Sequence, residues 1–159
     1  MLKNIRRATN DDIGAIANLL SQVLEVHHKA RPDIFRTGAR KYTDGELAEI
    51  IADDTRPIFV ATDERDAVIG YAFCVHICHK NDNILTDIKT LYIDDLCVDE
   101  AVRGTHVGRA LYDFVASYAK ECGCYNLTLN VWSGNDGAMR FYEKCGLKPQ
   151  KIGMELILE

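Results

Sequence analysis

The stretch LYIDDLCVDEAVRGTHVGR, residues 91–109, decides the fold. Its first part, Leu91–Val98, is rich in apolar and β-branched side chains, which predicts a largely buried strand. From Gly108 to Glu121 the apolar residues recur at helical spacing, and Gly123 ends that pattern. The strand therefore leads through a short loop, residues 103–109, directly into a helix.

This loop, residues 103–109, predicts an anion site at the start of the helix. Such a loop points several backbone N–H groups into one space, and the helix N-terminus adds partial positive charge. Gly104 and Gly108 permit a positive φ or close approach of a ligand, and Arg103 and Arg109 add charge. A pyrophosphate fits this description, although two glycines before a helix are also compatible with an ordinary turn. Neither GxxxxGK[ST] nor GxGxxG is present, so the P-loop and the Rossmann fingerprint are excluded.

The rest of the chain predicts antiparallel strands first and then alternating strands and helices. Further strands are expected at residues 3–8, 57–62, 67–79, 126–132 and 148–158, and further helices at 13–24, 44–54 and 137–144. This order, without a repeat or a linker, indicates one mixed α/β (α+β) domain spanning residues 1–159.

Composition narrows the possible partners and the compartment. The net charge is −5 and there is no basic run, so nucleic acid is not expected and a cationic substrate suits the chain better. The polar N-terminus and the absence of a long apolar run predict a cytoplasmic protein without a membrane partner. The six cysteines are then expected as thiols. Cys74, His76 and Cys78 share a strand face, but a second ligand pair with zinc spacing is missing, so no metal is expected.

Two motifs resemble the signatures of the GCN5-related N-acetyltransferase (GNAT) superfamily. Residues 103–108 fit Q/R-x-x-G-x-G/A, with His106 where glycine is usual; histidine tolerates unusual backbone conformations better than most residues. Residues 135–147, NDGAMRFYEKCGL, resemble N-x-x-A-x-x-F-Y-x-x-x-G-F, with Leu147 in the last place. The resemblance spans nearly the whole chain. It implies a GNAT fold, with a mixed, mostly antiparallel sheet of six to seven strands, about four helices and a V-shaped splay between central strands.

The resemblance implies acetyl-CoA as the cofactor, bound where the strand Leu91–Val98 splays from the strand Asn126–Trp132. Tyr142 is implied as the general acid that protonates the leaving thiolate, and a phenol of pKa about 10 suits that role. The further cofactor-binding residues implied are the backbone of Leu96, Cys97 and Val98 for the pantetheine arm, Arg103, Gly104, Thr105, His106, Val107, Gly108 and Arg109 for the pyrophosphate, and Asn135.

Asp94 and Asp95 are the candidate general bases and resemble the acidic pair of diamine and polyamine acetyltransferases. An alkyl amine has a pKa near ~10.4, so a base must take its proton before attack. A regular strand turns only one of the two toward the cleft, whereas a bulge presents both. Glu25 and His28, at the end of the first helix, are the candidate wall of the acceptor pocket. A solvated strand end and a polar helix end are the structural alternatives.

The predicted activity is direct transfer of an acetyl group to a small cationic primary amine. Protein N-termini or lysines are an alternative acceptor, and a non-catalytic acyl-CoA-binding module is an alternative from another class. A covalent route through Cys97 is a rival mechanism, although this thiol is expected to pack inside the sheet. Trp132 is expected in the core or a dimer contact, or stacked on acceptor or adenine. The apolar segment 152–158 predicts a homodimer.

Overall fold

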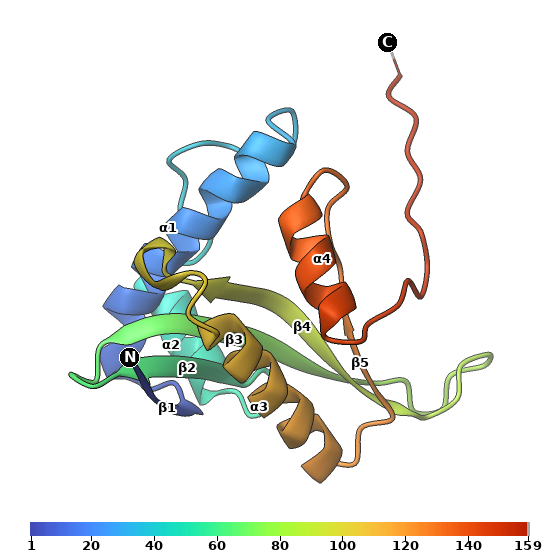
Figure 1. Cartoon of the computed structure of the whole chain (residues 1–159). Helices are drawn as coiled ribbons and strands as arrows, with labels where there is room; N and C mark the ends of the chain where they lie inside the picture. Colours follow the sequence, from blue (N-terminus) through green and yellow to red (C-terminus); the bar gives the residue numbers. More distant parts are fainter. Residues whose placement is uncertain (159) are drawn as a thin grey trace.

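The computed structural model describes residues 1–158 and centres on a mixed sheet in the order β1-β2-β3-β4-β5 (Figure 1). Neighbouring strands pair antiparallel except β4 and β5, which are parallel. The strands are β1 (Leu2–Arg7), β2 (Ile58–Asp63), β3 (Val68–Cys78), β4 (Lys89–Val98) and β5 (Asn126–Leu129). The helices are α1 (Ile13–Ala30), α2 (Asp44–Ala52), α3 (Val107–Glu121) and α4 (Asp136–Lys144), with 3-10 turns at Asn10–Asp12 and Glu100–Val102.

Helices cover both faces of the sheet and create two apolar layers (Figure 1). On one face, Leu19 of α1 and Leu47 of α2 pack with Tyr71 of β3. On the other face, Leu111 and Val115 of α3 pack against the sheet. Because each helix presents one apolar stripe and each strand alternates its side chains, both layers are buried. The predicted mixed α/β class is confirmed.

A buried carboxylate fixes the start of α1. Asp12 accepts hydrogen bonds from the Thr9 backbone N–H at 2.8 Å and from the Arg6 guanidinium at 2.7 and 3.0 Å. Burial works to raise the pKa of Asp12, but the bonds from Arg6 and Thr9 outweigh it and hold this pKa below its ordinary value. The ion pair therefore ties β1 to the helix that later forms one side of the candidate site.

Two predicted strands differ from the structure. The strand expected at 126–132 ends at Leu129, and residues 148–158 form no strand of this sheet. The segment instead runs beside α4 and away from β5 (Figure 1). Its large apolar side chains are 70–89% exposed, namely Ile152, Met154, Leu156, Ile157 and Leu158. A strand needs a neighbouring edge to receive its backbone groups, and this path offers none within the described chain, so the sheet has five strands rather than six to seven.

Candidate functional site

The predicted splay lies where β4 separates from β5. The parallel pairing runs from Thr90 with Asn126 to Ile93 with Leu129 and ends there. Strand β4 continues to Val98 and stays paired with β3 on its other side. The backbone edge of residues 94–98 that faces away from β3 is therefore free of a strand partner within the described part of the chain. In Figure 1, α1 and α4 both rise above β4, with a gap between the two helices.

A bulge in β4 lies at the splay. Phe73 of β3 pairs with Asp95 and Cys74 pairs with Ile93, so Asp94 has no opposite residue. Ile93 packs in the α3 layer, whereas the Asp95 side chain contacts the α1 and α2 layer through Tyr71. One extra residue lets consecutive side chains leave a strand on the same side. The Lys41 ammonium group, whose charge acts on both Asp94 and Asp95, lies on that common side.

Asp95 is a buried carboxylate with a hydrogen-bonded partner. Its residue is 9% exposed, and the Tyr71 hydroxyl donates to Oδ2 at 2.7 Å. Burial raises the pKa of Asp95, while the Tyr71 hydrogen bond and the charges of Lys41 and His27 oppose that rise without cancelling it. A carboxylate whose pKa moves toward neutrality is a better proton acceptor near pH 7.

Tyr142 lies on α4 across the splay from this carboxylate. It is half-buried, and its ring centroid lies 5.0 Å from that of Phe141. Burial, with the negative charge of Asp95 as a further cause, raises the pKa of Tyr142 above its ordinary value. The phenol therefore keeps its proton at neutral pH and remains a possible donor.

Asn135 begins α4. Its side-chain oxygen accepts the backbone N–H of Ala138 at 3.2 Å, which satisfies one of the donors that a helix start leaves unpaired. The amide NH₂ of Asn135 is the part of the side chain that remains for a ligand.

The loop at the start of α3 has the backbone conformation of an anion site. Gly104 has φ +81°, and His106 has φ +67° and ψ +6°, in the left-handed region that glycine favours. The histidine thus adopts a conformation that glycine favours, at the position where the related motif has glycine. Helix α3 begins at Val107, and the N–H groups of its first turn have no partner within the helix. The loop therefore combines free N–H groups with the positive end of the helix dipole.

The charged ends of this loop have partners of their own. The Arg103 Nε donates to the Val98 carbonyl at 3.1 Å, and the Arg109 Nε donates to the Asp113 carboxylate at 2.9 Å. A Cβ at Gly108 would lie 3.5 Å from a methyl group of Val98 and 3.6 Å from the ring of Phe141. Gly108 thus permits close packing of α3 on its neighbours. Within the loop, Thr105 is exposed, and its hydroxyl donates to the Val102 carbonyl.

Cys97 points its thiol into the apolar layer that α1 and α2 cover. The side chain is buried, and its sulfur lies 3.6 Å from the Leu19 carbonyl oxygen of α1. Burial raises the pKa of Cys97 to about 12, so the thiol stays neutral near pH 7. The nucleophilic thiolate that a covalent route requires is thus disfavoured. Leu96 and Val98 pack in the opposite layer, and all three residues place their backbones on the free edge of β4.

The end of α1 meets the loop that precedes α2. His28 Nδ1 lies 2.6 Å from the Phe35 carbonyl oxygen, and the Phe35 ring lies 5.0 Å from His27 and 5.3 Å from Trp132. Trp132 follows β5, so this loop reaches from α1 across to the β5 side of the splay. His28 thus supports the loop, whereas Glu25 is exposed and has no hydrogen bond among the described residues.

Two residues of this site, Tyr71 and Lys41, were not predicted from the sequence. The role of Tyr71 depends on the register between β3 and β4, which follows from pairing rather than from local composition. Lys41 lies in the irregular loop before α2, where residue periodicity gives no signal. Lysine beside an acidic strand end is too common on surfaces to identify a site by itself.

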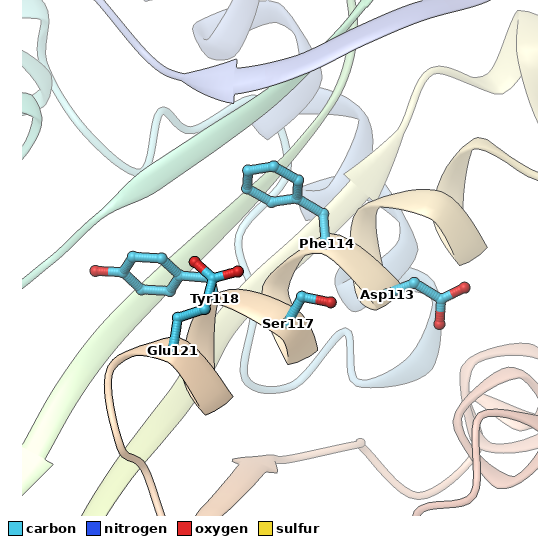
Figure 2. A pocket seen from close by; sticks show the side chains of 5 residues that line it. All are labelled: Asp113, Phe114, Ser117, Tyr118 and Glu121. Atoms are coloured by element: carbon cyan, nitrogen blue, oxygen red, sulfur yellow. The ribbon is translucent and has the colours of Figure 1, made fainter.

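Other features of the described residues lie outside this site. Figure 2 shows a hollow along α3, lined by Asp113, Phe114, Ser117, Tyr118 and Glu121, and none of the predicted site residues is among them. No group of three or more His, Cys, Asp or Glu side chains within residues 1–158 is arranged to hold a metal ion. Among the same residues, no helix has the length and apolar character needed to cross a membrane.

The model of the acetyltransferase (GNAT) family matches residues 20–147, and the chain belongs to this family. Together with its relatives, this makes the chain an acetyl-CoA-dependent N-acetyltransferase. The peptidyl-lysine N-acetyltransferase YjaB of Escherichia coli K12 is 27% identical over 148 residues, which cover 93% of this chain and 84% of that protein. The glucosamine 6-phosphate N-acetyltransferase of Arabidopsis thaliana is 35% identical over 66 residues, 42% of either chain.

Solved structures agree with the fold. A mutant of the BH1408 protein of Bacillus halodurans has a TM-score of 0.94 and 34% identity, covering 99% of this chain and all of that one. The Arabidopsis glucosamine-6-phosphate N-acetyltransferase structure has a TM-score of 0.72 and 25% identity, covering 100% of this chain and 99% of that one. The acceptors named for these relatives differ, so the acceptor of this chain has to be argued from its own site.

Proposed function

We propose that this chain acetylates a primary amine on a small molecule, with Asp95 as the general base and Tyr142 as the general acid. Acetyl-CoA, when bound, supplies the acetyl thioester that the amine attacks directly. The observation that carries the proposal is the bulge in β4, which presents a buried carboxylate of raised pKa beside an unpaired strand edge. Base and acid come from different elements, β4 and α4, and the free edge belongs to the strand that carries the base.

The residues of the described chain fit the parts of acetyl-CoA. The free edge of residues 96–98 has unpaired backbone groups that an extended pantetheine arm would pair with. The N–H groups at residues 104–108 and the start of α3 suit the pyrophosphate. A backbone N–H at the bulge would polarise the thioester carbonyl. These residues orient the thioester, and the side chains on β4 and α4 move the protons.

Asp95 and Tyr142 each move one proton in this scheme. Asp95 takes the proton of the ammonium form, directly or through a water molecule, and leaves a neutral amine. With acetyl-CoA bound, the C–N bond would form as the C–S bond breaks, and the nitrogen, which then carries a positive charge, would give up its second proton to solvent. Tyr142 would give its proton to the departing sulfur, since its raised pKa keeps it protonated until then, and would regain a proton from solvent.

The loop between α1 and α2, which lies beside Asp94 and Asp95, supports a small acceptor. Phe35 of this loop contacts Trp132 beyond the splay, and Lys41 contacts Asp94. A loop held beside the acidic pair by these contacts favours a slender amine over a folded protein surface. A peptidyl lysine is the second candidate acceptor, because the E. coli relative named for that activity matches 93% of the chain.

The test is release of CoA thiol from acetyl-CoA with a panel of small amines and a lysine peptide. Asp95→Asn and Tyr142→Phe should each lower kcat by about 10²-fold or more, the usual range for an acid or base. Asp54→Asn and Tyr125→Phe are matched controls, because both side chains are exposed and lie outside the site. Full turnover in Asp95→Asn would refute the base, and a preference for the peptide would replace the small acceptor.

We also propose that two copies associate through residues 148–158. The alternating side chains Ile152, Met154 and Leu156 are 78%, 89% and 82% exposed in one chain. Burying each is worth about 1.5–3 kcal/mol, enough for a stable contact when several are covered. Sedimentation at micromolar concentration should give a dimer, and a chain ending at Gln150 should give a monomer. A wild type that sediments only as a monomer refutes the association.

A further inference from the structure

An amine of the protein itself already contacts the acidic pair. Lys41 Nζ lies 3.1 Å from Oδ2 of Asp94, and the two side chains are 40% and 33% exposed. Burial works to lower the pKa of Lys41, but the charges of Asp94 and Asp95 outweigh it and raise this pKa. The ammonium group therefore stays charged and occupies one of the two carboxylates available to an acceptor.

Neighbouring contacts hold Lys41 in this place. The Tyr42 ring stacks on Phe73 with centroids 5.9 Å apart and an interplanar angle of 16°. The Lys41 ammonium group lies 5.3 Å from the centroid of the same Tyr42 ring. The next residue, Thr43, caps α2 by accepting the Glu46 N–H, and the Glu46 carboxylate accepts the Thr43 N–H at 2.7 Å. The backbone that follows Lys41 is thus anchored by Tyr42 and Thr43.

Asp94 and Asp95 differ in whether their carboxylate has a charged partner. Asp94 forms an ion pair with Lys41, whereas Asp95 accepts a hydrogen bond from the neutral Tyr71 hydroxyl. Among residues 1–158, Asp95 forms no ion pair within 4.0 Å, although the charges of Lys41 and, less strongly, His27 act on it at longer range. The pair therefore offers an acceptor one carboxylate without an ion-pair partner rather than two.

We propose that Lys41 determines acceptor specificity by neutralising Asp94, so that the site selects an amine with one positive charge over a diamine of the same reach. This inference rests on the proposed function, in which Asp95 receives the reacting amine. A diamine gains from a second free carboxylate only when Asp94 is released from Lys41. An exposed or half-exposed ion pair changes an equilibrium constant by up to about fivefold, which sets the expected size of the effect.

The experiment compares 1-aminobutane with 1,4-diaminobutane, which have the same carbon chain and differ in one amino group. The readout is the ratio of kcat/KM for diamine over monoamine at saturating acetyl-CoA. Lys41→Gln should raise this ratio about fivefold, mainly through a lower KM for the diamine. Lys41→Arg keeps the charge and should keep the wild-type ratio. Lys3→Gln is the matched control, because it breaks a Lys–Asp contact at 4.0 Å outside the site.

The double variant Lys41→Gln/Asp94→Asn isolates the pairwise effect. Removing both charges should return the ratio to its wild-type value, since the freed carboxylate is gone. A ratio in folded Lys41→Gln within twofold of wild type overturns the proposal, and so does a rise that persists in the double variant.

Binding separates this proposal from the proposed function. Calorimetric titration of the same two amines into wild type and Lys41→Gln measures the preference without turnover. A fivefold gain in relative diamine affinity supports the role of Lys41 even if no amine is acetylated, a result that refutes the proposed function alone. Turnover of the amines by a Lys41→Gln protein whose relative affinity for the diamine is unchanged supports the proposed function and refutes the role of Lys41.

Discussion

Replacing Tyr71 by phenylalanine tests whether Asp95 is the base, because it removes the 2.7 Å hydrogen bond to this carboxylate and keeps the ring. Hydrogen bonds to charged groups contribute about 1.5–3 kcal/mol, and Tyr71 itself is fully buried, on the core side of Asp95. One pKa unit corresponds to about 1.36 kcal/mol, so the already raised pKa of Asp95 should rise by a further unit or more.

The assay is the pH dependence of kcat/KM for the amine at saturating acetyl-CoA. A base acts only when deprotonated, so activity falls as the pH drops through the pKa of Asp95. In Tyr71→Phe this acidic limb should move up by about one unit. The same substitution should also change the pH dependence of stability. A carboxyl group whose pKa is higher in the folded state stabilises the fold at low pH, and this contribution is lost as pH rises through the folded pKa. Tyr71→Phe should therefore lose more stability at pH 8 than at pH 4.

The matched control is Tyr118→Phe. This substitution also removes a hydroxyl that is hydrogen-bonded to a side chain, His76 Nε2 at 2.9 Å, but it does so on α3 and away from the acidic pair. An acidic limb that stays in place in a folded Tyr71→Phe protein, or that moves equally in Tyr118→Phe, would show that the limb does not report Asp95.

Three further predictions concern the fold and the site. Asp12→Asn should cost about 2 kcal/mol in urea unfolding at pH 7, because it breaks the ion pair with Arg6. The difference should shrink as the pH falls below 3.8 through the lowered pKa of wild-type Asp12; an equal loss at pH 2.5 would contradict this. Gly108→Ala should stay within about 1 kcal/mol of wild type, whereas Gly108→Val should cost about 1–3 kcal/mol by crowding Phe141; equal losses would contradict the packing. Cys97→Ala should lose about 1 kcal/mol of stability and still transfer acetyl groups, and complete loss of turnover with acetyl-CoA still bound would revive the covalent route.

The loop before α3 could be predicted from the sequence because its signals are local. A strand, two glycines and a helix follow one another within residues 91–121, and each is identified from residues near it. The place of His106 in this loop agrees with the local prediction, since the residue has a left-handed backbone conformation, which histidine tolerates better than most residues. The roles of these loop residues in binding a cofactor stay predictions.

The contacts of the proposed acceptor site join segments that are distant in the sequence. For this reason they could not be predicted from local patterns. Lys41 and Asp94 are 53 residues apart, and Tyr71 and Asp95 are 24 residues apart, so no local pattern joins them. The conformation of residues 148–158 also depends on pairing that the local sequence does not reveal. Their alternation is typical of a strand, but a strand also needs an edge, and the described chain provides none for it.

The bulge explains why the acidic pair, the splay and the buried Asp95 carboxylate occur together. With Asp94 left out of the count, the side chains of β4 alternate regularly: Ile93 and Leu96 face the α3 layer, and Asp95 and Cys97 face the α1 layer. Asp94 is therefore the inserted residue, and the core contacts on both sides of it remain in register. An insertion that preserves both layers can add a carboxylate at the splay without exchanging core residues between faces. That extra carboxylate is the one that Lys41 occupies, so the residue that creates the bulge also carries the proposed control of acceptor charge.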